Sequence, residues 1–278
     1  MIIDKSILLL IGLIYSLPIK FFRLIGFIKD IHFDPRADWA RKHLSYKYLR
    51  GHGLEIGALH KALRVRPTVE VKYVDRFEAD ELRNQYPELG DLDIIDPDVV
   101  DNGETLETVA DNSQDFIIAN HFIEHCLNPI QTIENHLRKL NEGGILFYTV
   151  PHRDNTFDSN RPLTSVEHLV QDYDCGGEVS RVDHFREFAR YTKGVPENEV
   201  INQAAQLIKQ DYSIHYHVWT PETFESLLLH LKDKLDFSFE ILEVVEWKYA
   251  RFEFILILRK KNSSRRRGEH GVKKEKIT

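Results

Sequence analysis

The ten residues from Gly51 to His60, Gly-His-Gly-Leu-Glu-Ile-Gly-Ala-Leu-His, constrain the fold more than any other stretch of this chain. They predict a short buried strand over 54–56, a tight turn at Gly57 and a helix after the turn. Asp75 closes the next apolar strand, 20 residues after Glu55. In an open α/β sheet such a turn lies against a nucleotide-like ligand, and an acid at this spacing accepts hydrogen bonds from the ribose. The alternative is a plain strand–helix–strand unit that binds no ligand.

The turn contains one glycine, Gly57, which is followed by Ala58, Leu59 and His60. Dinucleotide sites need several glycines here, because backbone amides must cradle a pyrophosphate at a helix N-terminus. S-adenosylmethionine (SAM) has no phosphate, since it joins adenine and ribose to a methionine part that carries a sulfonium cation. The single glycine therefore favours SAM over a dinucleotide.

Around this turn, and more specifically between Asp115 and Pro151, the chain resembles class I SAM-dependent methyltransferases of the broad type-11 kind. In the later stretch a strand runs into Glu-His, Asn-Pro opens a helix, Gly-Gly follows, and a second strand ends in Val-Pro. That order is usual in the family, although further glycines usually stand where this chain has Leu59 and Lys61. The resemblance implies a Rossmann-like, doubly wound α/β fold with a mostly parallel seven-stranded sheet. Separately, the connection after strand five, residues 152–219, is too long to lack structure of its own and predicts an inserted helical cap over the carboxyl ends of the strands.

The resemblance further implies which residues hold the cofactor. The acid-x-Gly turn, Glu55 to Gly57, and the strand-two acid Asp75 are expected to bind it, and an acid after strand three is expected to meet the adenine amino group. Asp101 is the best match for that acid, and Asp98 is the alternative. The full set of expected cofactor contacts is Glu55, Gly57, Ala58, Leu59, Asp75, Arg76, Asp101, Asn102 and Asn120.

The segment His121-x-x-Glu124-His125 follows the fourth strand and matches a short metalloprotease pattern, but its place inside a methyltransferase-like unit argues against a protease. Small-RNA 2′-O-methyltransferases and ubiquinone-pathway O-methyltransferases carry the similar Glu-x-x-Glu-His and use it for a divalent cation. In the former, a histidine precedes a later Phe-Glu-aromatic segment, which residues 183–188 resemble. The resemblance therefore implies Glu124, His125 and His184 as metal ligands. With His121 in place of the first glutamate, the ligand set shifts toward nitrogen and away from Mg²⁺.

On an α-helix that begins by His121, the side chains of 121, 124 and 125 share one face. Alternatively, Glu124 and His125 only brace that helix. Methyl transfer to a hydroxyl needs positioning of the acceptor and removal of its proton, by a histidine or with the help of a cation. The candidate catalytic residues are His121, His125 and His184, with His152 in reserve.

Several methyltransferases that this chain resembles accompany polysaccharide biosynthesis, so O-methylation of a sugar or another small hydroxyl acceptor is the expected reaction. The alternative is a catalytically degenerate Rossmann-like module that acts as a membrane-attached partner in a glycan-assembly complex.

The expected cap, at about 152–219, is rich in histidine, but within it no Cys-x-x-Cys or His-x-x-x-His pair indicates zinc. His215-Tyr216-His217 alternates as a strand does, which predicts both imidazole rings on one side. The rings could face the substrate, but packing beside Trp219 is the favoured interpretation. The cap belongs to a methyltransferase domain expected over 31–259. The length and apolar content of the chain, 278 residues and 42%, suit one large core of this kind.

The two ends of the chain differ from the rest. Within residues 1–30, the uncharged run Ser6–Ile19 is too short to span a membrane, and Pro18 interrupts it. Basic residues among aromatic and aliphatic ones suit an interfacial helix on a membrane surface, although a helix that packs on the domain or mediates self-association has a similar pattern. Residues 260–278 are basic and apolar-poor, which predicts a disordered tail.

The composition indicates the cellular compartment of the protein and the class of its partners. Two cysteines, Cys126 and Cys175, make no disulfide framework, so we expect a cytoplasmic protein. The pattern of residues 1–30 adds the expectation of peripheral membrane contact. The net charge is −7 although the tail is basic, and an acidic body argues against a nucleic-acid partner. We therefore expect a small-molecule or saccharide acceptor.

Overall fold

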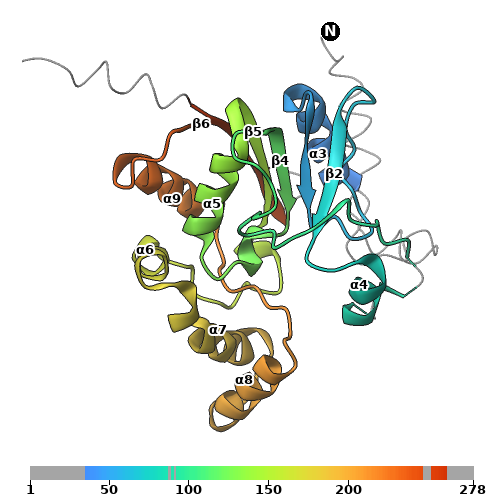
Figure 1. Cartoon of the computed structure of the whole chain (residues 1–278). Coiled ribbons are helices and arrows are strands. Elements are labelled where there is room, and N and C mark those ends of the chain that lie inside the picture. The colour runs from blue at the N-terminus through green and yellow to red at the C-terminus, as the bar shows by residue number, and fades with distance from the viewer. Residues whose placement is uncertain (1–34, 87–88, 91, 247–251, 262–278) are drawn as a thin grey trace, which may run out of the picture. The chain divides into compact units, whose positions relative to one another are not determined.

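The computed structural model of the chain describes residues 35–86, 89–90, 92–246 and 252–261 (Figure 1). The predicted interfacial segment 1–30 and the basic tail after Lys261 lie outside these residues, so neither prediction is tested. Within the described ranges, no helix is both long enough and apolar enough to cross a membrane.

The described strands form one seven-stranded sheet in the order β3-β2-β1-β4-β5-β7-β6. Neighbours among β1 to β5 pair in parallel, whereas β7 is antiparallel to both β5 and β6. The expectation of a doubly wound, mostly parallel seven-stranded sheet is confirmed. The strand bounds are β1 His52–Ile56, β2 Glu70–Asp75, β3 Val99–Val100, β4 Gln114–Asn120, β5 Leu140–Pro151, β6 Phe239–Glu246 and β7 Glu253–Lys260.

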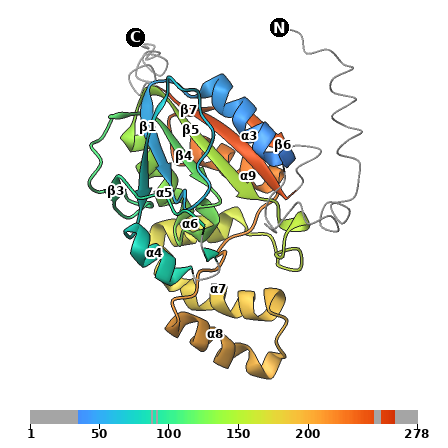
Figure 2. The ribbon, with the colours of Figure 1, turned by 90° about the vertical axis from the view of Figure 1, so that its right-hand side faces the viewer.

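The central strand β4 is buried on both faces, and its alternating side chains belong to two separate apolar clusters. Phe116 and Ile118 pack in one cluster with Ala40 and Leu44 of helix α3 (Pro35–Tyr48). Ile117, on the opposite face, packs in the other cluster with apolar residues of α5 (Pro129–Lys139) and α9 (Pro221–Asp233). The sheet is therefore the middle of three layers, with α3 on one side and α5 and α9 on the other (Figure 2).

The starts of α5 and α9 agree with the sequence signals. Asn128 is the N-cap of α5 and accepts a hydrogen bond from the amide of Gln131, and proline occupies the first helical position. Thr220 and Thr223 form a reciprocal capping box at the start of α9, which also begins with proline. Each cap satisfies amides that would otherwise lack a partner at the helix start.

The predicted helix after Gly57 is wrong, because residues 57–69 form an irregular loop. Leu59 adopts a left-handed backbone conformation with φ of +48°, which interrupts a right-handed helix. The amide of Leu63 donates to both carboxylate oxygens of Glu55, at 2.9 and 3.0 Å. The amide of Leu63 thus donates to the side chain of Glu55 and not to a backbone carbonyl oxygen, as it would in an α-helix. The first helix after β1 is α4, Ala79–Gln85, which follows β2.

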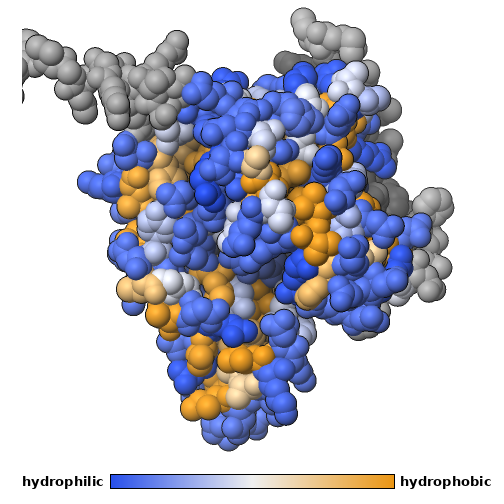
Figure 3. Space-filling view, in the orientation of Figure 1, coloured by the Kyte–Doolittle hydropathy of each residue, from blue (hydrophilic) through white to orange (hydrophobic). Residues whose placement is uncertain are grey.

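The segment 152–219 after β5 contains the expected helical cap, in α6 (Val166–Cys175), α7 (Arg181–Glu187) and α8 (Val200–Lys209). A five-residue π-helical turn, Phe188–Thr192, continues α7, and 3₁₀ turns lie at 153–155, 177–179 and 197–199. Phe185, Phe188 and Leu207 give α7 and α8 a small core of their own. In Figure 1, α7 and α8 lie on the side toward which the parallel strands point, and Figure 3 shows apolar patches over this part.

Strand β7 includes the first residue of the predicted tail. Lys260, expected to begin the disordered tail, is the last residue of β7. Its ammonium group donates to the carbonyl oxygen of Leu140 at 2.7 Å and to the side chain of Asn112 at 2.8 Å. These bonds attach the end of β7 to the start of β5.

Candidate active site

The order of the strands reverses between β1 and β4, and in open α/β sheets ligands bind beyond the carboxyl ends of the strands at such a point. Glu55 in β1 and Asn120 at the end of β4 meet there, since the Asn120 amide donates to Glu55 Oε1 at 3.1 Å. Glu55 is 1% exposed, and burial raises the pKa of its carboxyl group to about 7 although the amide of Leu63, Asn120 and Arg41 favour the charged form. Glu55 therefore holds the loop after β1 and the end of β4 in place.

The turn after β1 needs its glycine for the backbone angle and not for space. Gly57 has φ of +65°, and a Cβ there would meet only the ring of Phe122, at 3.9 Å. The amide of Gly57 donates to the carbonyl oxygen of Val74, which fixes the turn beside the end of β2. A Cβ at Gly103 would lie 2.5 Å from Ile56, so the chain after β3 also passes close to the end of β1.

The predicted ribose and adenine acids lie side by side. Asp75 ends β2, and its carbonyl oxygen accepts the amide of Asp101, the first residue after β3. Burial raises the pKa of the Asp75 carboxyl. Burial also opposes ionisation of Asp101, but hydrogen bonds from the hydroxyl and amide of Thr108 lower its pKa. Asp98 precedes β3 and accepts the amide of Tyr73, so Asp101 is the acid that follows strand three. Arg76 and Asn102, each next to one of these acids, donate their amides to Asp75 Oδ1 and Asp101 Oδ1.

The expected α-helix from His121 to His125 is wrong. His121 has φ of +49° and its amide donates to the carbonyl oxygen of Thr149 in β5, so the residue continues the sheet pairing. Only the 3₁₀ turn Ile123–His125 follows. Nevertheless, His121 Nδ1 lies 3.6 Å from Glu124 Oε1, so the two side chains are neighbours without sharing a helix face.

His121 belongs to a buried network with Glu253 and Arg41. Glu253, at the start of β7, is 2% exposed and forms a bidentate ion pair with Arg41 of α3. Burial opposes its ionisation, but the Arg41 charge and the bond from His121 lower the pKa of Glu253 to about 2. Burial lowers the pKa of His121, although its side chain remains 32% exposed. We therefore treat His121 as neutral, with Nε2–H donated to Glu253 Oε2 at 2.6 Å.

Glu124 and His125 meet a third residue, His215, which the sequence pattern suggested was only packed beside Trp219. One ligand atom from each of the three lies within 4.8 Å of the others. Glu124 is 1% exposed, neither of its carboxylate oxygens accepts a hydrogen bond, and burial raises its pKa well above the ordinary value. His215 Nε2 lies 4.0 Å from Glu124 Oε1. A buried carboxylate of this kind needs a proton or a cation.

Both imidazole rings of this group are held through Nδ1. His125 Nδ1 donates to the carbonyl oxygen of Ile214 at 2.8 Å, and His215 Nδ1 donates to Asp158 Oδ2 at 2.6 Å. Burial lowers the pKa of His125 to about 3, which keeps it neutral. On a neutral imidazole ring, a proton on Nδ1 leaves the lone pair on Nε2. Hydrogen bonds of this kind orient histidine ligands in metal sites.

The cap fixes His215 through a buried arginine. Arg161 pairs with Asp158 at 3.0 Å and donates to the carbonyl oxygens of His215 and Tyr216 at 2.7 and 3.0 Å. Asp158 and Arg161 are each 1% exposed. No spacing rule relates Asp158 to His215, which lies 57 residues further along the chain.

The structure separates His184 from Glu124 and His125. His184 Nε2 lies 3.2 Å from His168 Nε2 and groups with His168, Asp172 and His217. The expected ligand set Glu124, His125 and His184 is thus divided between two clusters. The prediction that His215 and His217 point to one side is also wrong, because the chain bends at Tyr216.

His152, the reserve catalytic residue, belongs to neither of the clusters formed by described residues. It lies just after β5, its backbone forms a bridge with Trp219, and its Nδ1 accepts the amide of Asp154.

Comparison with known proteins points to one family. A family model described as a methyltransferase domain matches residues 51–231. A SAM-dependent methyltransferase structure from Aquifex aeolicus is 14% identical, with 82% of this chain and 90% of that chain covered and a TM-score of 0.40. The N-methyltransferase NodS from Bradyrhizobium japonicum WM9, in complex with S-adenosyl-L-homocysteine, is 13% identical, with 84% and 90% covered and a TM-score of 0.45. No curated protein sequence gives a significant match.

Proposed function

Because the chain belongs to the methyltransferase domain family and is a SAM-dependent methyltransferase, we propose that it methylates a hydroxyl oxygen of a sugar or another small hydroxyl compound. The observation that supports an oxygen acceptor is the buried group of Glu124, His125 and His215 beside His121. This arrangement offers both routes to a nucleophilic hydroxyl, which are a base for its proton and ligands for a cation.

The strand ends offer groups that fit SAM. Asp75 is a half-buried acid at the place that suits ribose hydroxyls. Asn120 Oδ1 is a buried acceptor without a hydrogen-bond partner, and SAM carries an ammonium group able to donate to such an oxygen. When bound, SAM supplies an electrophilic methyl group on its sulfonium.

We assign the removal of the hydroxyl proton to His121. Its Nε2–H is donated to Glu253, so Nδ1 carries the lone pair that accepts the proton. The ring is partly exposed and therefore within reach of an acceptor, whereas Glu253 is buried and ionised. Once the proton reaches Nδ1, the carboxylate stabilises the imidazolium, and the electron pair left on the oxygen is the nucleophile.

Glu124, His125 and His215 also fit a divalent cation. Three protein ligands leave coordination positions open for an acceptor oxygen, which is typical of catalytic rather than structural sites. A cation there would lower the pKa of a bound hydroxyl. Two nitrogen ligands and one oxygen favour Zn²⁺, Co²⁺ or Mn²⁺ over Mg²⁺.

Calorimetry with SAM alone tests the cofactor part of the proposal, since it needs no acceptor. We expect the full chain to bind SAM. No detectable binding would instead support a degenerate, non-enzymatic module, an alternative that the irregular loop after Gly57 favours.

The reaction is tested by measuring S-adenosyl-L-homocysteine released with SAM and a panel of mono- and disaccharides. We expect an O-methylated product, and His121→Asn should lower the rate by about 10²- to 10⁴-fold with unchanged SAM affinity. His43→Asn, on α3, is the matched control and should keep full activity. A product methylated on nitrogen or carbon, or a fully active His121→Asn, would contradict the proposal.

The cation is tested separately with Glu124→Gln, which leaves the other histidine cluster of the cap unchanged. We expect this variant to lose one bound metal ion and its activity together. Full activity in Glu124→Gln would show that proton removal by His121 needs no cation.

A further inference from the structure

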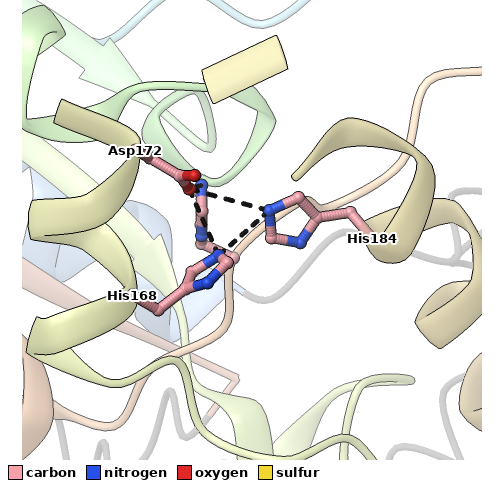
Figure 4. Close-up of side chains that lie close together, drawn as sticks. His168, Asp172 and His184 are labelled. Carbon is pink, nitrogen blue, oxygen red and sulfur yellow. Dashed lines mark hydrogen bonds and ion pairs between the residues drawn. The ribbon is translucent and has the colours of Figure 1, made fainter. Parts of the chain in front are cut away.

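A second cluster of metal-ligating side chains lies within the cap, apart from the proposed active site. His168 and Asp172 stand one turn apart on α6, and His184 comes from α7. The fourth member, His217, comes from the segment that leads to α9. Figure 4 shows that the side chains of His168, Asp172 and His184 point toward one another.

The distances between the ligand atoms suit one small cation. His168 Nε2 lies 3.2 Å from His184 Nε2 and 3.2 Å from Asp172 Oδ2. Asp172 Oδ2 is 3.9 Å from His184 Nε2 and 4.0 Å from His217 Nε2. All four ligand atoms lie within 4.8 Å of one another. Around a tetrahedral zinc ion with bonds of 2.0–2.1 Å, ligand atoms are about 3.3 Å apart.

Hydrogen bonds within the cluster do not satisfy these groups. Asp172 is fully buried, and neither of its oxygens accepts a hydrogen bond of good geometry, although His168 Nε2 lies at ion-pair distance. His217 is also fully buried, and its Nδ1 has no hydrogen-bond partner. A buried carboxylate and several imidazoles this close together need a positive charge between them to offset the cost of burial.

We infer that His168, Asp172, His184 and His217 bind one Zn²⁺ and that this ion is structural. Three imidazole nitrogens and one carboxylate oxygen form a ligand set that suits zinc. Four protein ligands complete a tetrahedral shell, so the site leaves no position for substrate, unlike the three-residue group of the proposed active site.

The ion would join three parts of the chain that come together in the folded cap. It connects α6, the short helix α7 and the segment 211–219. No side-chain hydrogen bond caps the N-terminus of α7, so an ion held by His184 would add a connection between this helix and α6. Zinc therefore stabilises the arrangement of the cap, and this role does not depend on which acceptor the enzyme methylates.

The usual zinc spacing does not reveal this site, because its helical pair is His-x-x-x-Asp. Asp172 stands where a second histidine would complete the familiar i, i+4 pair. The other two ligands follow 12 and 45 residues after Asp172, and only the folded cap brings them together.

Metal analysis of the full-length protein tests the inference. We expect wild-type protein, loaded with Zn²⁺ and dialysed against metal-free buffer, to retain zinc, and Asp172→Asn and His184→Asn each to retain one equivalent less. His215→Asn, which alters only the three-residue group, should keep the cap ion. Equal zinc content in wild type and His184→Asn, or loss of all zinc in His215→Asn, would overturn the proposal.

Two measurements that alter none of the four proposed ligands guard against variants that fail to fold. With Co²⁺ in place of Zn²⁺, we expect the intense visible absorption of a tetrahedral ion, and His215→Asn should keep that absorption. Chelator should lower the melting temperature of wild type, and Zn²⁺ but not Mg²⁺ should restore it. A weak octahedral cobalt spectrum, or a melting temperature that ignores chelator, would refute the site.

Discussion

Glu253→Gln tests whether the buried ion pair with Arg41 holds α3 to the sheet. Glu253 is 2% exposed and Arg41 12%, so the substitution leaves an unpaired guanidinium in a nearly dry site. Breaking a buried pair from one side costs about 3–5 kcal/mol. The pKa gives a similar figure, because a fall from 4.5 to about 2 corresponds to about 3 kcal/mol. A loss of about 3 kcal/mol in a domain of this size should lower the melting temperature by about 6–12 °C at pH 7.

The dependence on pH has a definite sign. The pKa of Glu253 is lower in the folded protein than its ordinary value of 4.5. Its stabilising contribution is therefore complete above about pH 4.5 and is lost as the pH falls toward 2. Scanning calorimetry should show the difference between wild type and Glu253→Gln shrinking as the solution is acidified through this range.

A second ion pair, between α3 and strand β6, supplies the matched control. Lys47 pairs with Glu243, but the lysine side chain is 51% exposed and that of Glu243 25%. Because exposed pairs contribute about 1 kcal/mol or less, Glu243→Gln should shift the melting temperature only slightly. Adding Arg41→Met to Glu253→Gln should recover stability, since the unpaired charge is removed. Equal effects of the two glutamine variants, or no recovery with Arg41→Met, would refute the reasoning.

Three further predictions concern the cofactor and the fold. Asp75→Ala should weaken SAM binding at least tenfold, about 1.4 kcal/mol by calorimetry, because a charge-assisted bond to the ribose is lost. Gly53→Ala should lower the free energy of unfolding in urea by about 3 kcal/mol, because its Cβ would lie 2.2 Å from the carbonyl oxygen of Phe116. Asn128→Ala should cost about 2 kcal/mol in the same assay, since it removes the cap of α5 and a bond to the carbonyl oxygen of Asp172.

Each of these predictions has a control. Glu70→Ala, at the exposed start of β2, should leave SAM affinity unchanged, and an unchanged affinity in Asp75→Ala would end the ribose assignment. In the control Gly143→Ala, the added Cβ would meet no atom within 4 Å, but the backbone has φ of +77°. We expect this variant to lower the free energy of unfolding by about 1 kcal/mol. If Gly53→Ala is as stable as Gly143→Ala, strands β1 and β4 can separate locally to make room for the Cβ. Asn128→Asp keeps the capping oxygen but not the NH₂ group that donates to the carbonyl oxygen of Asp172. It should therefore lower the free energy of unfolding by about half as much as Asn128→Ala does.

The sheet could be predicted because each signal for it is local. The strand predicted over 115–120 is built on the continuous apolar run 116–119. Asn128-Pro129 and Thr220-Pro221 mark helix starts through caps that need no distant partner. Polar residues at strand ends, such as Asp75, likewise stand where the order of elements places them.

The contacts that decide the site could not be predicted, because they depend on partners far apart in sequence. The loop after Gly57 is not helical because the side chain of Glu55 reaches the amide of Leu63. Arg41 and Glu253 are 212 residues apart, and no pattern relates them. Alternation predicts that neighbouring even or odd positions share a side, but a single bend at Tyr216 sends His215 and His217 to different clusters.

That bend places the two clusters on one short piece of backbone. The amides of Tyr216 and His217 both point to the carbonyl oxygen of Glu124, at 2.7 and 3.3 Å, so the segment is attached to the 3₁₀ turn that carries Glu124 and His125. A displacement of His217 therefore moves His215 as well. Substitutions in the two clusters should therefore be non-additive in their effect on the free energy of unfolding.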